Sequence, residues 1–262
     1  MLLSLNAFTA IDQYNATEVY IRALEDFDRI EQLQELKQIE KAAVPTSSSV
    51  LDVGCGFGLE SLAFARWGIG AVHGLDRSEL FIAEARQRAA QAGLAIDYRV
   101  GSADELPFPD GSFDHVRAER LLLYFDDVVP AIAEMKRVLR PGGTLALLEP
   151  DFSTTTVNLE DRVLLRRVMA HEADTAVAQS WLPGRLSTLL PKLGFNDISI
   201  ATRVVVFPQD LAAAYFLGAG QKAGDAGVIS AAEHEAWQRE IGALRSDKAL
   251  FGSEGFFLFI CR

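Results

Sequence analysis

An apolar run that ends in three alternating glycines constrains the fold of this chain more than any other feature. Residues 50–58 have the sequence Val-Leu-Asp-Val-Gly-Cys-Gly-Phe-Gly, and a segment of helical periodicity follows at about residues 59–67. Glycine lets the backbone turn tightly, and a ligand can approach its N–H groups because no Cβ stands in the way. The pattern therefore predicts a strand, a ligand-binding turn and a helix, in that order.

Short apolar runs and helical segments then alternate as far as residue 148, which is typical of βαβ units around a parallel sheet. We expect strands at residues 50–53, 71–75, 96–100, 113–118 and 144–148, and helices at about 59–67, 78–91 and 127–139. Pro141, Gly142 and Gly143 end the last of these helices. Outside this region we expect helices at about 15–43, 159–178, 186–193, 211–223 and 231–246, and strands at 198–207 and 256–261.

A length of 262 residues suits one main domain with some decoration. We divide the chain into lid helices at 1–44, a core at 45–207 and 251–262, and a helical insertion at 208–250. Insertions at one end of a sheet commonly carry binding residues. We therefore expect the insertion to shape a substrate pocket.

The net charge and the cysteine content of the chain limit the classes of partner that we expect it to bind. The formal net charge is -11, so the surface repels a phosphate backbone and no nucleic-acid partner is expected. Cys55 and Cys261 have no metal-ligand spacing, which predicts no disulfide, no metal site and a cytoplasmic setting. Residues 1–8 lack the basic flank of a signal peptide, and no apolar run reaches the roughly 18 to 20 residues of a membrane span. The oligomeric state stays open.

Glycine turns after a first strand occur in more than one class of nucleotide-binding enzyme. A nicotinamide-dependent oxidoreductase would place its ribose-binding carboxylate about where Asp76 stands. Here the glycines alternate as G-x-G-x-G, Leu59 replaces the last Gly or Ala of the dinucleotide fingerprint, and Asp52 precedes the first glycine by two residues. This pattern resembles the first motif of the class I S-adenosylmethionine-dependent methyltransferases.

The resemblance extends over most of the chain. Asp76 ends the second predicted strand, where the family has a carboxylate for the two ribose hydroxyls, and two lone-pair sites suit a vicinal diol. Residues 101–114 resemble the family's adenine-binding segment and fourth strand, and residues 137–143 resemble the turn before the fifth strand. Residues 119–125 and 149–152 are similar to the small-molecule branch related to the ubiquinone and menaquinone biosynthesis methyltransferases.

The resemblance implies an α/β, Rossmann-like fold with a seven-stranded, mostly parallel sheet and helices on both faces. The family's strand order is 3-2-1-4-5-7-6, and its seventh strand is antiparallel. The implied cofactor is S-adenosylmethionine, and Tyr14 is expected to fold over it. The residues that we assign to the cofactor are Tyr14, Asp52, Gly54, Cys55, Gly56, Asp76, Arg77, Ala103, Asp104 and Glu119.

Aromatic residues in the segments around the expected pocket favour a largely apolar acceptor. We assign to it Phe152, Trp181, Phe207, Tyr215 and Phe216. A phenol, hydroxyl or enol acceptor needs a base. His171 is one candidate, because it shares a helical face with Leu164 and Val168; Glu149 and Asp151 follow a strand end, where parallel sheets place ligands.

These features predict methyl transfer from S-adenosylmethionine to a small, largely apolar acceptor, by O- or C-methylation of a natural-product or quinone-like metabolite. Two alternatives remain at this point. One is a nicotinamide-dependent oxidoreductase, and the other is a protein of the same fold that binds the cofactor without transferring a methyl group.

The assignment of the ribose site leads to a direct test. Asp76→Ala is expected to weaken cofactor affinity by one to two orders of magnitude, about 1.4 to 3 kcal/mol, because the diol loses a charged acceptor. Calorimetric titration with the cofactor measures this change. Unchanged affinity would contradict the role of Asp76.

Overall fold

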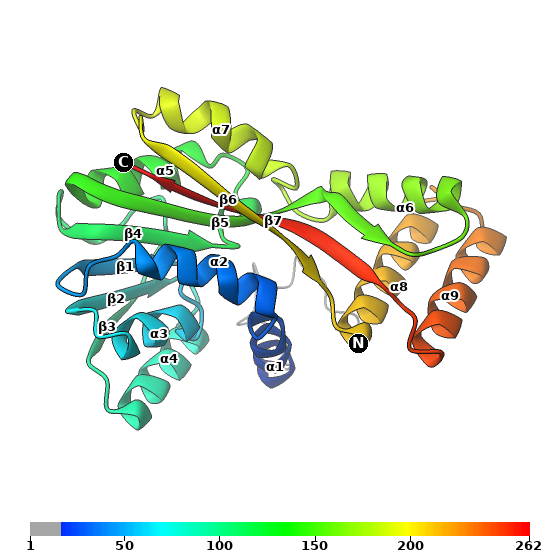
Figure 1. Ribbon diagram of the computed structural model, residues 1–262, viewed down its shortest axis with the longest axis horizontal. Helices are drawn as coiled ribbons and strands as arrows, with labels where there is room; N and C mark the ends of the chain where they lie inside the picture. The colour runs from blue at the N-terminus through cyan, green and yellow to red at the C-terminus, as the bar shows by residue number, and fades with distance from the viewer. Residues whose placement is uncertain (1–16) are drawn as a thin grey trace.

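The computed structural model describes residues 17–262, with side chains from residue 21 onward. Figure 1 shows a sheet through the middle of the molecule, helices on both of its faces, and a further group of helices at one end. No helix within residues 17–262 has the length and apolarity that a bilayer crossing needs.

The sheet has seven strands in the order β3-β2-β1-β4-β5-β7-β6, which confirms the predicted topology. β7 runs antiparallel to both of its neighbours, and the pairs from β3 to β5 are parallel. The strands are β1 (Ser49–Val53), β2 (Ala71–Asp76), β3 (Ile96–Val100), β4 (Phe113–Glu119), β5 (Leu139–Val157), β6 (Ile198–Val206) and β7 (Gly252–Cys261).

Helices cover both faces because successive residues of a strand point to opposite sides. In β5, Leu145 and Leu147 pack with α5 (Val129–Val138) and α7 (Leu182–Lys192), on the upper side in Figure 1. Ala146 and Leu148 belong to the cluster on the opposite face, to which α2 contributes. The helices on that face are α2 (Glu31–Ala42), α3 (Leu59–Arg66) and α4 (Glu79–Ala92).

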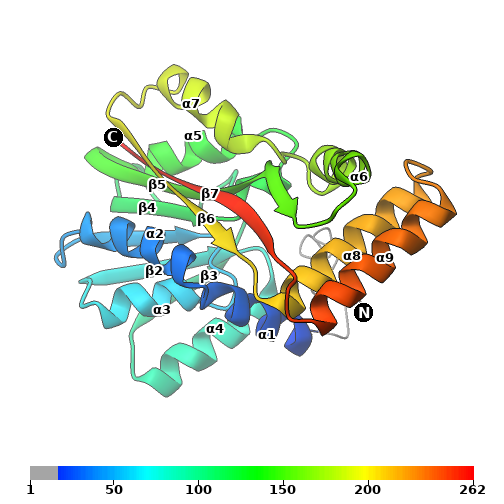
Figure 2. The same ribbon diagram turned by 45° about the vertical axis from the view of Figure 1, so that its right-hand side comes forward.

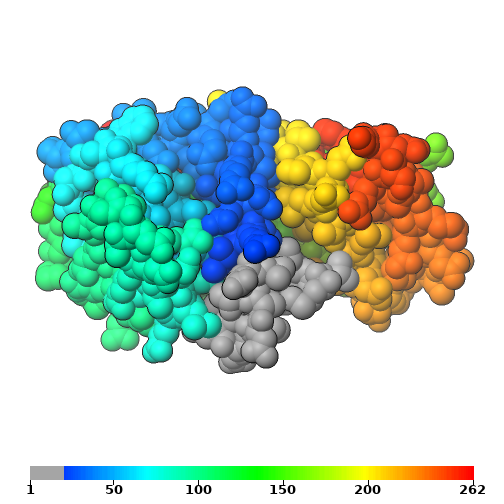
Figure 3. Space-filling view, turned by 90° about the horizontal axis from the view of Figure 1, so that it is seen from below, coloured from blue at the N-terminus to red at the C-terminus, as the bar shows by residue number. Residues whose placement is uncertain are grey.

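Four helices gather beyond the carboxyl ends of the parallel strands. α8 and α9 lie side by side in Figures 1 and 2, and α6 packs against α8. Seen from below in Figure 3, α1 lies between the sheet region and α8. The bounds of these helices are α1 (Thr17–Asp28), α6 (Arg162–Thr175), α8 (Gln209–Asp225) and α9 (Ala231–Ser246).

Some predicted boundaries were wrong. β5 reaches Val157 instead of 148, and β7 begins at Gly252 instead of 256, because the two strands pair with each other past a register shift between Asp151 and Thr156. The helices predicted within 15–43 are α1 and α2, and they are separated where Ile30 leaves helical geometry at φ -64° and ψ 125°. The extra length of β7 brings Glu254 into the sheet.

The contact between α8 and α9 allows a matched test of packing. A Cβ on Gly220 of α8 would collide with the fully buried Trp237 of α9, whereas a Cβ on Gly242 of α9 meets nothing within 4 Å. Gly220→Ala is expected to lower the free energy of unfolding by about 1 to 3 kcal/mol. Gly242→Ala is expected to raise it by about 0.5 to 1 kcal/mol, because alanine favours the helix. Urea unfolding measures the free energy of unfolding of both variants. Equal changes in the two variants would contradict the close contact between Gly220 and Trp237.

Candidate functional site

A cavity of about 790 Å³ opens at the carboxyl ends of the parallel strands and continues under α1 and α8. We divide it into two parts. The glycine lobe is lined by residues that follow or end β1, β2, β3 and β4, including Gly54, Gly56, Asp76, Ala103 and Glu119. The aromatic lobe is lined by Phe27, Tyr124, Phe152, Phe207, Tyr215 and Phe256, with Glu172, Lys222 and Glu254 among them.

The turn after β1 needs glycine for two separate reasons. Gly54 and Gly56 have φ of 72° and 52°, in the left-handed region that side chains disfavour. A Cβ on Gly54 would also lie 2.7 Å from Leu121 Cδ1. The N–H groups of Gly54 and Cys55 both donate to the Leu75 carbonyl, at 2.7 and 3.0 Å, which ties the turn to the end of β2.

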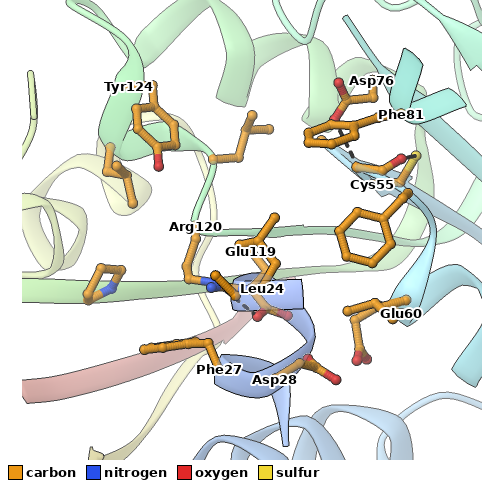
Figure 4. A pocket seen from close by; sticks show the side chains of 18 of the residues that line it. Leu24, Phe27, Asp28, Cys55, Glu60, Asp76, Phe81, Glu119, Arg120 and Tyr124 are labelled. Carbon is orange, nitrogen blue, oxygen red and sulfur yellow. Dashed lines mark hydrogen bonds and ion pairs between the residues drawn. The ribbon is translucent and has the colours of Figure 1, made fainter. Parts of the chain in front are cut away.

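Asp76 joins this turn to the start of α4. Its Oδ2 accepts a hydrogen bond from the Gly56 N–H, and its Oδ1 accepts one from the Ser78 N–H, both at 2.9 Å. In Figure 4, Asp76 lies above Cys55 and beside Phe81, on one side of the cavity. The carboxylate is thus held at the rim of the glycine lobe by two backbone donors. Burial, followed by the charges of Asp52 and Asp76, raises the pKa of the Cys55 thiol well above its usual value, so it stays protonated.

The floor of the glycine lobe is a buried network of charges centred on Arg117. Its guanidinium donates to Glu40 Oε1, Asp52 Oδ1 and Glu119 Oε2, each at 2.9 Å, and the side chain is 2% exposed. Lys37 of α2 lies 3.0 Å from both Glu60 and Glu119 and also pairs with Asp28. The network therefore ties α1 and α2 to β1 and β4.

The pKa shifts favour the charged forms of Glu40, Glu119 and Lys37, whereas burial raises the pKa of Asp52 despite the charge of Arg117. Burial alone would raise the pKa of Glu40, but the charge of Arg117 and the bond to His115 outweigh it and lower this pKa to about 2. Burial is likewise outweighed at Glu119, whose pKa is lowered by Lys37, Arg120 and Arg117. The three carboxylates of Glu60, Glu119 and Asp28 raise the pKa of Lys37 against the effect of burial.

Arg120 stands where the two lobes meet. Its backbone has φ of 49°, a left-handed conformation that is uncommon for a residue other than glycine. Its Nε lies 3.3 Å from Glu119 Oε1, and its guanidinium stacks 4.8 Å from the centre of the Phe27 ring. Figure 4 shows Arg120 and Glu119 between Tyr124 on one side and the α1 residues Phe27 and Asp28 below.

The structure brings most of the predicted binding residues to this cavity. The predicted cofactor residues from Asp52 to Glu119 all line it, whereas Tyr14 lies outside the described residues. Of the predicted acceptor residues, Phe152, Phe207 and Tyr215 line the cavity, but Trp181 and Phe216 do not. Trp181 is half exposed and donates its Nε1–H to the Ala173 carbonyl at 3.0 Å. Phe216 is fully buried in the core between α8 and β7.

The three predicted bases lie away from the cavity wall, so this geometry does not support their role. Glu149 Oε1 accepts from the N–H groups of Leu121 and Leu122, and burial raises its pKa to about 8. Asp151 accepts from the N–H and hydroxyl of Ser153. His171 is partly exposed on α6, and the neighbouring residue Glu172 lines the cavity instead.

Sequence reasoning missed several charged residues of the cavity, among them Lys37, Glu60, Arg117 and Arg120, although one signal was present. Arg117 interrupts a strand that was predicted from its apolar residues, and a cation in a buried strand needs partners. Lys37, Glu60 and Arg120 gave no comparable signal, because each lies in a segment where exposed charges are ordinary.

The network predicts that replacing a buried arginine costs far more stability than replacing an exposed one. Arg117→Met leaves the carboxylates of Glu40, Asp52 and Glu119 buried without their shared cation, so the free energy of unfolding is expected to fall by about 3 to 5 kcal/mol. Arg140→Met is the matched control. It breaks the exposed pair with Asp114 and is expected to cost at most about 1 kcal/mol. Similar losses in urea unfolding would refute a structural role for the network.

Comparison with known proteins places this site in a family. Residues 51–147 match the family model described as a methyltransferase domain. An uncharacterized 37.1 kDa protein in transposon TN4556 of Streptomyces fradiae is 34% identical over 200 residues, which are 74% of this chain and 58% of that protein. A demethylmenaquinone methyltransferase of Bacillus licheniformis is 33% identical over 141 residues, 50% of this chain and 60% of that protein. The chain thus spans less than two thirds of the length of these relatives.

A solved structure agrees at the level of fold. The phosphoethanolamine N-methyltransferase 2 of Haemonchus contortus, solved with phosphomonomethylethanolamine and S-adenosylhomocysteine, superposes with a TM-score of 0.61 at 18% identity, covering 100% of this chain and 61% of that one. Together with the matched domain, the glycine turn and the strand order, this agrees with the resemblance seen in the sequence: residues 51–147 match a methyltransferase domain, and the fold is that of the class I S-adenosylmethionine-dependent methyltransferases.

Proposed function

We propose that this protein transfers a methyl group from S-adenosylmethionine to a small, largely apolar acceptor. The observation that carries the proposal is the continuity of the cavity, because the glycine lobe opens directly into the aromatic lobe. One cavity of about 790 Å³ is within the size range of small-molecule sites. A cofactor in the first lobe and an acceptor in the second would meet at Arg120 and Tyr124.

The residues of the glycine lobe suit the cofactor. The turn at Gly54 and Gly56 leaves no Cβ over its backbone, and a Cβ at Gly54 would collide with Leu121. Asp76 offers a carboxylate to the ribose diol, and Ala103 and Asp104 stand where the adenine would bind. The carboxyl groups of Asp52 and Glu119 in the floor favour a ligand that carries an ammonium group and a positively charged sulfur.

When bound, the cofactor supplies a methyl group on a positively charged sulfur. The task of the protein is to hold the acceptor atom in line with that methyl group, at roughly 3 Å. The aromatic side chains of Phe27, Phe152, Phe207 and Phe256 exclude water from the acceptor and fix its plane. Because positive charge is lost in the transfer, an apolar lobe does not oppose the reaction.

The aromatic residues that line the second lobe and the names of the relatives both support a hydrophobic small molecule as the acceptor. The aromatic lobe matches the hydrophobic ring that the name of the demethylmenaquinone methyltransferase implies for that relative. We assign O- or C-methylation of a natural-product or quinone-like metabolite, with residues 1–44 as a lid and residues 208–250 as the wall of the acceptor pocket. The net charge of -11 speaks against nucleic acid, and the free thiols of Cys55 and Cys261 suit a cytoplasmic setting.

Calorimetric titration tests the proposal against the oxidoreductase alternative. The protein is expected to bind S-adenosylhomocysteine at least tenfold more tightly than NADH, a difference of about 1.4 kcal/mol or more. Asp76→Ala serves as the control that locates the binding in the glycine lobe. Tighter binding of NADH would overturn the proposal.

A panel of hydrophobic acceptors tests transfer itself. Mass spectrometry with a deuterium-labelled methyl donor detects methylated products directly. Cofactor binding with no product across phenols, enols, amines and carbon nucleophiles would instead favour a protein that binds the cofactor without transferring a methyl group.

A further inference from the structure

Glu254 is an acidic side chain in an apolar part of the cavity. It lies on β7, two residues from Phe256, so both side chains project from the same face of the strand toward the aromatic lobe. Glu254 is 5% exposed. Burying a carboxyl group in apolar surroundings is costly unless it gains partners. Its position therefore calls for a physical reason.

Two hydroxyl groups lie beside this carboxyl. Thr155 of β5 donates its hydroxyl to Glu254 Oε1 at 2.9 Å. The Tyr215 hydroxyl of α8 is buried and has no hydrogen bond of normal geometry among the described residues. Burial and the charges of Glu254 and Glu172 raise the pKa of Tyr215, so its hydroxyl keeps its proton. Three elements thus bring one carboxyl and two hydroxyls together, and two of these residues, Glu254 and Tyr215, line the lobe.

The charged neighbours of Glu254 come from four elements. Glu172 of α6 is paired with Lys222 of α8, at 2.9 and 3.2 Å. Asp151 of β5 and Arg120 after β4 act on Glu254 from further away. No ion pair joins Glu254 itself to a cation within residues 21–262. The carboxyl is therefore balanced by a hydroxyl, not by a positive charge.

The surroundings of Glu254 determine the pKa of its carboxyl group. Burial is the largest effect on Glu254, and the charges of Glu172 and Asp151 act in the same direction. The hydrogen bond from Thr155 and the charge of Arg120 oppose them, and the net result is a pKa of about 8. A group with a pKa near the working pH exchanges protons readily in either direction.

A line of contacts connects Glu254 with the glycine lobe. The ring of Phe256 lies 5.6 Å from that of Phe27, and Phe27 stacks under Arg120 at 4.8 Å. Arg120 in turn lies 3.3 Å from Glu119, at the end of β4. The charge of Arg120 also acts on Glu254 itself. An acceptor hydroxyl placed between these two side chains would therefore face both the Glu254 carboxyl and the junction of the two lobes.

We infer that the acceptor carries a hydroxyl group, as a phenol or an enol, and that Glu254 accepts the proton of that hydroxyl. This inference rests on the proposed function. The O–H proton passes to the Glu254 carboxylate, and the oxygen forms a bond to the methyl carbon. The carbon–sulfur bond breaks, its electron pair stays on sulfur as a thioether, and Glu254 later releases the proton to water. Tyr215 and Thr155 orient the hydroxyl and the carboxylate.

Other acids of the site suit this role less well. Glu172 also lines the aromatic lobe, but its ion pair with Lys222 stabilises the negative charge and weakens it as a proton acceptor. Glu149 Oε1 and Asp151 Oδ1 accept hydrogen bonds from backbone donors, and neither residue is among those that line the lobe. Glu254 combines access to the lobe with a carboxylate that has no cation beside it.

Ligand binding gives a test that does not depend on turnover. The probes are 2-naphthol and its methyl ether, which differ only in the hydroxyl proton, and their fluorescence reports binding to the protein with S-adenosylhomocysteine present. Wild type is expected to prefer the naphthol by about tenfold, the effect of one hydrogen bond. Glu254→Leu is expected to lose this preference, and the exposed Glu235→Gln is expected to keep it.

Transfer to 2-naphthol then separates binding from proton acceptance. Glu254→Gln retains a polar amide, so its affinity for naphthol is expected to stay within about threefold of wild type. Its kcat is expected to fall at least a hundredfold. The wild-type rate is expected to rise with pH and level off above about 8, because the base must be ionised, and the Gln variant is expected to lack this rise.

Thermal unfolding provides a check on the variants. A folded pKa of about 8, above the ordinary 4.5, stabilises the fold at low pH, and this stability is lost as the pH rises through about 8. Glu254→Gln is expected to show a smaller fall in Tm between pH 5 and 9 than wild type, which also demonstrates that the variant is folded.

The outcomes distinguish the two proposals. Wild-type protein that does not bind S-adenosylhomocysteine would refute the proposed function. If the cofactor analogue binds, the inference about Glu254 is overturned by any of three results: no preference for naphthol over its ether, the same preference in Glu254→Leu, or an unchanged kcat and pH profile in Glu254→Gln.

Discussion

The ion network around Arg117 is the constraint on which the rest of the site depends. A cation buried in the middle of β4 is tolerated because Glu40, Asp52 and Glu119 surround it. Those carboxylates come from α2, β1 and β4, so satisfying one charge fixes three elements at the end of the sheet. Lys37 extends the network to Asp28 of α1. Charge therefore holds α1 and α2 beside the cavity, in addition to apolar packing.

The two lobes of the cavity above this floor are formed by different parts of the chain. The glycine lobe comes from the strand ends between residues 52 and 119, which are neighbours through the parallel pairing of β1 with β2 and β4. The aromatic lobe combines Phe27, Phe152, Phe207 and Phe256, from segments spread over more than two hundred residues. The named residues of the glycine lobe lie within the matched methyltransferase domain, residues 51–147, whereas these four aromatic residues lie outside it.

The predicted catalytic residues show where sequence reasoning fails. Glu149 and Asp151 were chosen because they follow a strand end, but β5 continues to Val157, so they lie within an extended strand. A side chain in a strand faces one side or the other, and the pattern of a mixed segment does not tell which. Glu254 was overlooked for a related reason. Residues 252–255 contain two glycines, so the strand was predicted only from 256, and pairing with β6 extends it.

The sequence by itself indicated the strands and helices of the core, the glycine turn and Asp76 at the end of β2, because these depend on local periodicity and on residues close together in the chain. The sheet order and the cofactor class followed from the resemblance of its motifs to the methyltransferase family. Only the tertiary structure decided which charges meet under the turn, which aromatic rings share the second lobe, and which acid faces it. Those contacts join residues as far apart as Phe27 and Phe256. Such pairs are fixed by the packing of whole elements, to which no local pattern is sensitive.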